Sequence, residues 1–232
     1  MFFIDPAWVV EQNHIYTQPL VHQVASKSTK KCGKRSDPIV RVKVKESKVN
    51  YDITKTSTEL KALSGDAYSP YGSEVHTEVG GLTRGRIVAS GESKLDYNQK
   101  GNRVCLWFTD IDVVIETDPL VYIAKKHMQN NCRYKQIMTH EMKHVRVQRK
   151  LIKEYSRIMR KHIAKKAEEM GVTGPVAAKD AEQAAKDMRN QINNAAKEII
   201  DEILVERDKR QQSVDTKEEY ALISRELDRC GR

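Results

Sequence analysis

Hydrophobic and polar residues alternate along the first half of the chain. Valine occupies every second position from 40 to 44, and this period of two predicts a half-buried strand. Turn-forming residues, among them Gly80, Gly81, Gly85 and Gly91, interrupt the pattern. Further runs typical of strands lie at residues 50–54, 74–79, 86–89, 103–108, 112–116 and 120–124. The first half is therefore predicted to form a mostly antiparallel sheet.

A long amphipathic helix is predicted next. Asn131 is a suitable N-cap and Gly171 a suitable C-terminal stop, so the helix is expected to span roughly 30 residues or slightly more. Apolar positions recur at spacings of three and four, and the same stripe includes His140 and His144. Both histidines are therefore expected to face the core.

Two further helices are predicted toward the C-terminus. Gly174 and Pro175 open the first, because proline is favoured at the first helical position, and its apolar stripe runs to about Arg210. The second is short, covers residues 217–229 and has Thr216 as its N-cap. Since the connection between the two long helices is short, they are expected to form an antiparallel hairpin.

These elements predict an α+β fold in which an N-terminal, mostly antiparallel sheet is followed by a long-helix hairpin. The sheet is assigned to residues 37–125 and the helices to residues 132–229. Residues 37–230 are expected to form a single domain, while residues 1–36 are expected to be poorly structured.

Composition narrows the class of protein. No run of about 18 apolar residues occurs, which argues against a membrane-spanning helix. The net charge of +9 favours anionic partners. However, the basic residues are spread widely and are not interleaved with the aromatic residues that stack on bases. A specific nucleic-acid partner is therefore not expected, and the oligomeric state is left open.

Four cysteines, Cys32, Cys105, Cys132 and Cys230, suggest disulfides, since no CxxC pair or zinc-finger spacing is present. A bond between Cys105 and Cys132 would join the long helix to the sheet, leaving Cys32 with Cys230, although three pairings are possible. The alternative is a set of buried thiols in a cytosolic protein. Disulfides predict a periplasmic or secreted location, although the start MFFIDPAWVV does not have the features of a signal peptide.

The segment HEMKH, residues 140–144, carries the candidate chemistry. Two histidines four residues apart lie one helical turn from each other, so both rings can bind one Zn²⁺ ion. Glu141 then lies beside the ion, where it can take a proton from a metal-bound water that zinc makes more acidic. The alternative is a pair of hydrogen-bonded core histidines with Glu141 in a surface ion pair.

The HEMKH segment, preceded by a sheet and placed on a long helix, resembles the zincin metallopeptidases. More loosely, segments such as VYIA, THEMKHV and DTKEEY resemble a group of bacterial secreted zincin-like proteins of undetermined substrate. The resemblance implies His140 and His144 as zinc ligands and Glu141 as general base. Lys143 and Arg146 depart from it, because such peptidases usually carry uncharged or apolar residues there.

A catalytic zinc site normally has a third protein ligand. If the two long helices turn near Gly171, then Glu198 faces His144 and Glu202 faces His140. Glu202 lies on the apolar stripe, so it is the candidate third ligand, with an ion pair at the flank of the helix as the alternative. Weaker candidates are His14, His22 and His76.

The predicted function is that of a zinc-dependent peptidase, in which metal-activated water attacks a peptide carbonyl with Glu141 as general base. A protein or peptide substrate would pair with an edge strand from residues 112–124. The alternative is a non-catalytic envelope protein, with a binding or structural role and a structural metal site or none.

Overall fold

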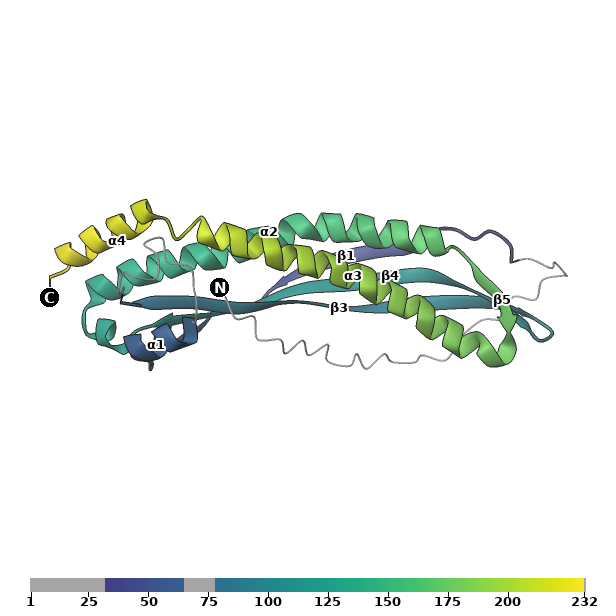
Figure 1. Ribbon diagram of the computed structural model, residues 1–232. Coiled ribbons are helices and arrows are strands. Elements are labelled where there is room, and N and C mark those ends of the chain that lie inside the picture. Colours follow the sequence, from purple (N-terminus) through teal and green to yellow (C-terminus); the bar gives the residue numbers. More distant parts are fainter. Residues whose placement is uncertain (1–31, 65–77, 232) are drawn as a thin grey trace.

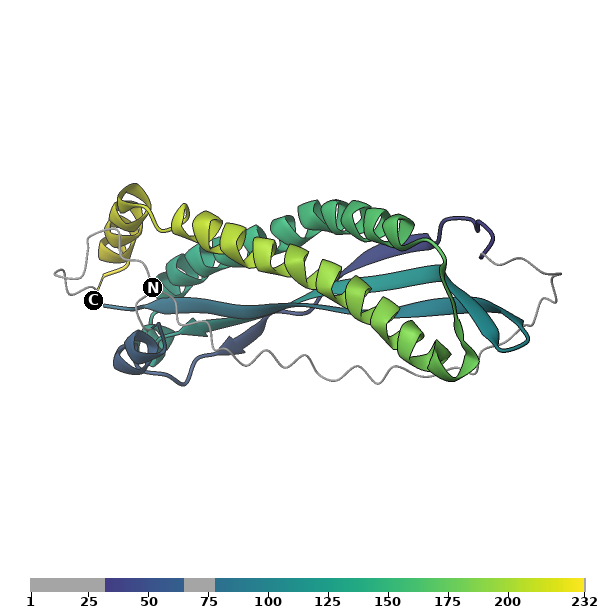
Figure 2. The ribbon, with the colours of Figure 1, turned by 45° about the vertical axis from the view of Figure 1, so that its right-hand side comes forward.

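The computed structural model describes residues 32–64 and 78–231. The molecule is elongated, with a long twisted sheet covered on one face by two long helices (Figures 1 and 2). Most of residues 1–36, which were expected to be poorly structured, lie outside the described ranges. Most of the strand expected at residues 74–79 lies outside them as well.

Within the described residues the sheet has five strands, and the other four all pair with β4 (Arg103–Ile123). Along one edge of β4, β3 (Gly81–Lys100) pairs antiparallel over its full length. Along the other edge, β1 (Ile39–Glu46) and β2 (Asn50–Asp52) pair parallel, and β5 (Thr173–Ala177) pairs antiparallel. The sheet is therefore mixed, which corrects the expectation of a mostly antiparallel sheet.

The strand β4 is continuous where the sequence pattern predicts three short strands, and β3 extends well beyond the one short strand predicted within it, residues 86–89. Gly85 and Gly91 do not form turns but lie within β3, where the backbone of β4 comes close. A Cβ atom on Gly91 would lie 2.7 Å from the Asp112 carbonyl oxygen. The expectation of an edge strand at residues 112–124 is wrong, because β4 is paired along both edges.

The helix α2 (Asn131–Met170) is 40 residues long, longer than predicted. It begins one residue earlier than expected, because the side chain of Asn130 caps it by accepting a hydrogen bond from the Arg133 backbone N–H at 3.1 Å. It ends at Gly171 as predicted, where φ is 51°.

The helix α3 (Ala181–Gln212) packs antiparallel against α2, so a helix hairpin is present (Figure 2). Its connection is not the short turn that was expected. Pro175, expected to open α3, lies in β5, and the short 3-10 helix η2 (Ala178–Asp180) follows. This insertion shifts the register of the hairpin, so that His162 contacts Glu198 at 2.9 Å.

Three shorter helices, besides η2, complete the part of the chain that the structure describes. The helix α4 (Lys217–Arg229) has the predicted bounds and the predicted cap, Thr216. The helix α1 (Ser57–Ser64) and the 3-10 helix η1 (Lys125–Gln129) were not predicted. Among the described residues, no helix contains an apolar stretch long enough to cross a bilayer.

The main core lies between the sheet and the α2–α3 hairpin. Burying an Ile or Leu side chain stabilises a fold by about 1.5–3 kcal/mol, so this layer holds the helices firmly on the sheet. A second cluster of buried residues lies where HEMKH packs on the sheet: Val121, Ile123, Ile137 and Val145. The fully buried members of the main core include Leu106, Ile115, Leu151, Ile152, Met159, Ile163 and Ile203.

Two disulfides are present, Cys32–Cys105 and Cys132–Cys230. This pairing differs from the one favoured above. Cys105 lies near the start of β4, and Cys132 follows its far end. At about 3.3 Å per strand residue, the 18 steps from residue 105 to residue 123 separate the two ends by about 60 Å, so Cys105 cannot reach Cys132.

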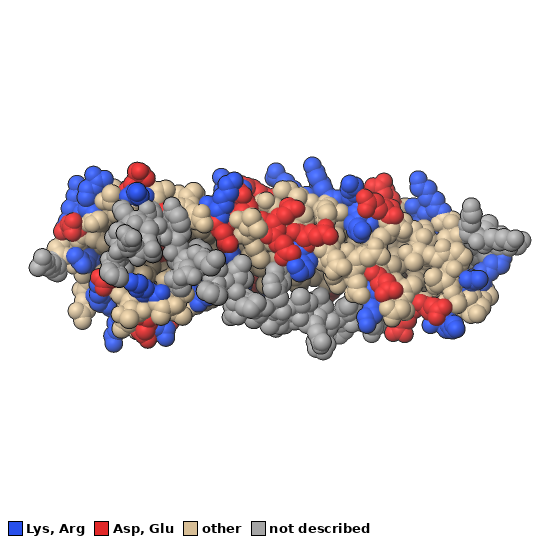
Figure 3. Space-filling model, in the orientation of Figure 1, with Lys and Arg blue, Asp and Glu red and all other residues tan. Residues whose placement is uncertain are grey.

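Basic and acidic side chains are interspersed along the molecule on the face shown in Figure 3. Several basic residues are paired with nearby carboxylates, as in the contact of Arg41 with Asp110 and Asp112. On this face the positive net charge is therefore not gathered into a single patch.

Candidate metal centre

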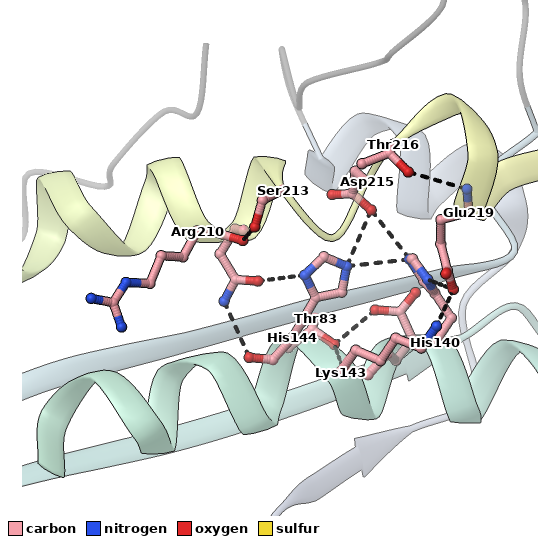
Figure 4. Close-up of polar contacts among 11 residues, drawn as sticks. Thr83, His140, Lys143, His144, Arg210, Ser213, Asp215, Thr216 and Glu219 are labelled. Carbon is pink, nitrogen blue, oxygen red and sulfur yellow. Dashed lines mark hydrogen bonds and ion pairs between the residues drawn. The ribbon is translucent and has the colours of Figure 1, made fainter. Parts of the chain in front are cut away.

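Two histidines of α2 and one aspartate from the α3–α4 loop converge on one point (Figure 4). His140 and His144 lie one turn apart and are 7% and 8% exposed, so both face inward as predicted. Asp215 lies in the segment 213–216, just before the cap of α4, and its side chain is 15% exposed. His140 and His144 are near the start of α2 and Asp215 follows the end of α3, so the three residues meet at the open end of the antiparallel hairpin.

The three ligand atoms form a nearly equilateral triangle. The His140 Nε2 and His144 Nε2 atoms are 3.2 Å apart, and each is 3.2 Å from Asp215 Oδ1. In a tetrahedral zinc site with bonds of about 2.0–2.1 Å, neighbouring ligand atoms are about 3.3–3.4 Å apart. The spacing therefore fits three ligands of one small metal ion.

Gln211 sets the tautomer of His144. Its amide nitrogen donates to the His144 backbone carbonyl at 3.2 Å, so its carbonyl oxygen must face the ring, where it contacts Nδ1. A carbonyl oxygen only accepts hydrogen bonds, so Nδ1 carries the proton and Nε2 presents its lone pair to the centre. Such a hydrogen bond to the far nitrogen is usual for metal-binding histidines.

Glu219 sets the tautomer of His140 in the same way. Its carboxylate lies 3.3 Å from His140 Nδ1 and also accepts from Lys143 Nζ. Its backbone N–H donates to the Thr216 hydroxyl oxygen at 3.1 Å, which caps α4. Glu219 therefore links the start of α4 to His140, and Lys143 holds its carboxylate in place.

These contacts leave the two Nε2 lone pairs and the Asp215 carboxylate facing one another. Without a cation, three electron-rich atoms at 3.2 Å repel each other unless a proton comes between them. Burial alone would raise the pKa of Asp215, but hydrogen bonds with His140 and His144, in which a protonated Nε2 is the donor, outweigh it and lower this pKa to about 2. Burial lowers the pKa of His144, but the hydrogen bond to Asp215 and the charge of Glu141 raise it overall. The centre therefore attracts positive charge, whether as a proton or as a metal ion.

Glu141 points from α2 toward β3. It is 4% exposed, and the Thr83 hydroxyl donates to its Oε2 at 2.7 Å. Burial raises the pKa of Glu141, although the nearby charges of His140 and His144 act in the opposite direction. Gly81 leaves the space that this carboxyl needs, because a Cβ atom there would lie 2.5 Å from Glu141 Oε1.

Glu202, the predicted third ligand, is not brought to the histidines. It is exposed on α3 and does not belong to the His140, His144 and Asp215 group. The prediction assumed a tight turn near Gly171, whereas β5 and η2 move the partner positions on α3 toward the C-terminus. The histidines considered as alternatives lie outside the described residues: His14, His22 and His76.

The sequence contained one signal for Asp215. Thr216 was predicted as a helix cap, and a carboxylate directly before a cap is held at the end of a rigid element. The missing information was the register of the hairpin, which decides that residues 211–219 face residues 140–144.

A small pocket of about 260 Å³ opens beside His140, between α2 and α4. Leu222 and Ile223 are apolar residues of its lining, which also includes His140, Lys143 and Glu219.

Comparisons with protein-family models, with curated proteins and with solved structures find no match to this chain. The assignment of the site therefore rests on the geometry of the chain itself: His140, His144 and Asp215 form a group that could hold a metal ion.

Proposed function

We propose that this protein is a zinc-dependent hydrolase that cleaves peptide bonds. The observation that carries the proposal is the triangle of His140 Nε2, His144 Nε2 and Asp215 Oδ1, at 3.2 Å on each side, with Glu141 next to His140 in the chain. Zinc is the proposed ion because two imidazoles and one carboxylate suit its borderline character, and three protein ligands leave one position open in a catalytic site.

When bound, zinc would polarise a water molecule and lower its pKa toward about 7. The residues of the chain would bind the ion and orient its ligands. His140, His144 and Asp215 would hold the ion, and Gln211 and Glu219 would keep the two rings oriented. This arrangement supplies a rigid frame, in which the catalytic groups do not need to reorganise during the reaction.

Glu141 is the proposed general base. Its carboxyl is shielded from solvent and kept in one orientation by the Thr83 hydroxyl. Burial raises the pKa of Glu141, and a raised pKa suits a group that must take up a proton at Oε1 or Oε2 and later release it to a leaving amine.

The pocket beside His140 supports a substrate with an apolar side chain. Leu222 and Ile223, which line this pocket with His140, would contact that side chain, and the scissile carbonyl would lie nearer His140. The two disulfides agree with an oxidising compartment, so we propose that the substrate is a protein or peptide outside the cytoplasm.

A second candidate is a structural metal site. It is favoured by the burial of Glu141, which is 4% exposed and hydrogen-bonded to Thr83, and by the enclosure of the three ligands. In this case the ion would fasten the α3–α4 loop to α2, and Glu141 would be a core residue.

Metal analysis of the purified protein is the first test. We expect one zinc per chain, and loss of that zinc in His140→Ala. A wild-type protein that contains no zinc and takes up none at neutral pH would refute both candidates.

Glu141→Gln then separates the two candidates, because it preserves the shape of the side chain and removes the base. For the hydrolase we expect full zinc content and loss of chelator-sensitive cleavage of an unfolded protein substrate. Glu202→Gln is the matched control, since Glu202 is exposed on α3, and it should keep wild-type activity. A wild type that binds zinc but cleaves no better than Glu141→Gln would favour the structural role.

A further inference from the structure

The helix α4 is joined to α2 at both of its ends. At its start, Asp215 and Glu219 contact His140. At its end, the disulfide Cys132–Cys230 bonds the residue after α4 to the first turn of α2. The short helix thus spans from the metal centre to a covalent anchor.

Hydrogen bonds surround the covalent anchor. The Asn130 side chain donates to the Cys230 carbonyl oxygen at 3.2 Å, and Arg133 Nε donates to the Gly231 carbonyl oxygen at 3.0 Å. Both donors belong to the start of α2, so the last turn of α4 is held against the N-terminal end of the helix that carries His140 and His144.

Apolar packing holds α4 only weakly. None of its residues is buried; Leu227 packs, partly buried, against the cluster around Ile137, and the Tyr220 ring meets the His140 ring edge-on. Leu222 remains 45% exposed. Because little apolar area is removed from water, the hydrophobic effect contributes little to docking, and the disulfide carries a large share of the constraint.

We infer that the Cys132–Cys230 disulfide is a positioning element of the metal centre, so that metal affinity depends on its oxidation state. With the bond closed, the start of α4 stays beside α2, and Asp215 and Glu219 remain at His140. With the bond open, α4 can leave α2, and both carboxylates become less well positioned. This inference rests on the proposed metal site and does not require peptide hydrolysis.

The proposed trigger is reduction by a dithiol. The S–S bond breaks, each cysteine sulfur gains one electron and one proton, and the dithiol loses two of each as it closes to a cyclic disulfide. Cys132 is exposed, so an attacking thiolate can reach it, whereas Cys32 and Cys105 are both partly buried. Reduction should therefore open Cys132–Cys230 first.

The expected effect is a rise of about 10–100-fold in the zinc dissociation constant, the range seen when an outer partner of a metal ligand is lost. Asp215 is also tethered through α3, whose Gln211 contacts His144. The site should therefore weaken and not disappear.

The test compares two double variants by zinc titration against a chromophoric chelator. Cys132→Ser with Cys230→Ser removes the anchor of α4. Cys32→Ser with Cys105→Ser removes the other disulfide, which lies at the far end of β4, and controls for general loss of stability. We expect the first variant to bind zinc about 10–100-fold more weakly than wild type, and the second to bind it within about threefold of wild type.

Two further measurements separate positioning from misfolding. The visible absorption of bound Co²⁺ reports the ligand geometry, and it should change in the first double variant while far-ultraviolet circular dichroism stays native. Wild-type protein that is reduced and then alkylated at Cys132 and Cys230 should show the same loss of affinity, because alkylated sulfurs cannot themselves bind zinc.

Equal zinc affinity and equal Co²⁺ spectra in wild type and the first double variant would overturn the inference and leave the metal site standing. An equal loss in both double variants would also overturn it, because the effect would then be general destabilisation. If oxidised wild type bound no zinc, the metal site itself would be refuted, and this inference with it.

Discussion

Gly81 offers a sharp test of how the HEMKH helix is positioned. A Cβ atom at Gly81 would lie 2.6 Å from Ile137 Cγ2 and 2.9 Å from Glu141 Cγ. Ordinary contact begins near 3.4 Å, so the Ile137 methyl group would have to move by about 0.8 Å (3.4 minus 2.6). Ile137 is 5% exposed, so it has little room to move unless α2 lifts from β3.

We therefore expect Gly81→Ala to destabilise the protein by about 1–3 kcal/mol, the usual cost of overpacking a close-packed interior. The two contacts fall on one helix turn, so a value in the upper half of this range is expected. The measurement is the free energy of unfolding in urea, made with a chelator present so that metal binding does not contribute. Activity should fall more than zinc content, because the new methyl group displaces Glu141.

Gly33→Ala is the matched control, because a Cβ atom there would meet no atom within 4 Å. It should change the free energy of unfolding by no more than about 0.5 kcal/mol, as is usual for a surface position. If Gly81→Ala were as mild as Gly33→Ala, the close contact between α2 and β3 at Glu141 would be refuted.

The remaining predictions concern the metal centre. Asp215→Ala should weaken zinc binding more strongly than Glu202→Ala does, as measured by competition with a chelator; equal losses would remove Asp215 from the site. Gln211→Leu should raise the zinc dissociation constant about 10–100-fold, because it removes the oxygen that orients the His144 ring; unchanged affinity would count against this role. In metal-free protein the raised pKa of His144 stabilises the fold below its unfolded pKa of about 6.5, and this stabilisation is lost as the pH rises through the folded value. Zinc-loaded protein should instead gain stability from pH 6 to pH 8, because zinc competes with protons for the same nitrogens. Urea unfolding at both pH values, with chelator or with zinc, tests this reversal; the same sign in both states would contradict it.

Features that depend on nearby residues were predictable from the sequence. The spacing of HEMKH placed His140 and His144 on the buried face of a helix, and both are buried in the structure. Thr216 and Gly171 marked helix ends correctly, because a cap is decided by the few backbone groups that it satisfies. The α+β class followed from the change of period between the two halves of the chain.

Features that depend on distant residues were not predictable. Gly85 and Gly91 suggested turns, yet they lie in β3 because the backbone of β4 comes close to them. Pro175 suggested a helix start, but the segment that contains it forms β5 and pairs with the start of β4. Because β5 forms where a helix start was predicted, the pairing of α2 with α3 is shifted. Asp215 therefore lies at the histidines, where Glu202 was predicted.

The distance along the chain between His144 and Asp215 has a consequence for how the protein acquires its metal. These residues are 71 positions apart (215 minus 144), and the segment between them contains most of α2, all of β5 and all of α3. Closing so long a loop is entropically costly for an unfolded chain. The three ligands come together when the α2–α3 hairpin closes, so zinc uptake would be coupled to the folding of that hairpin.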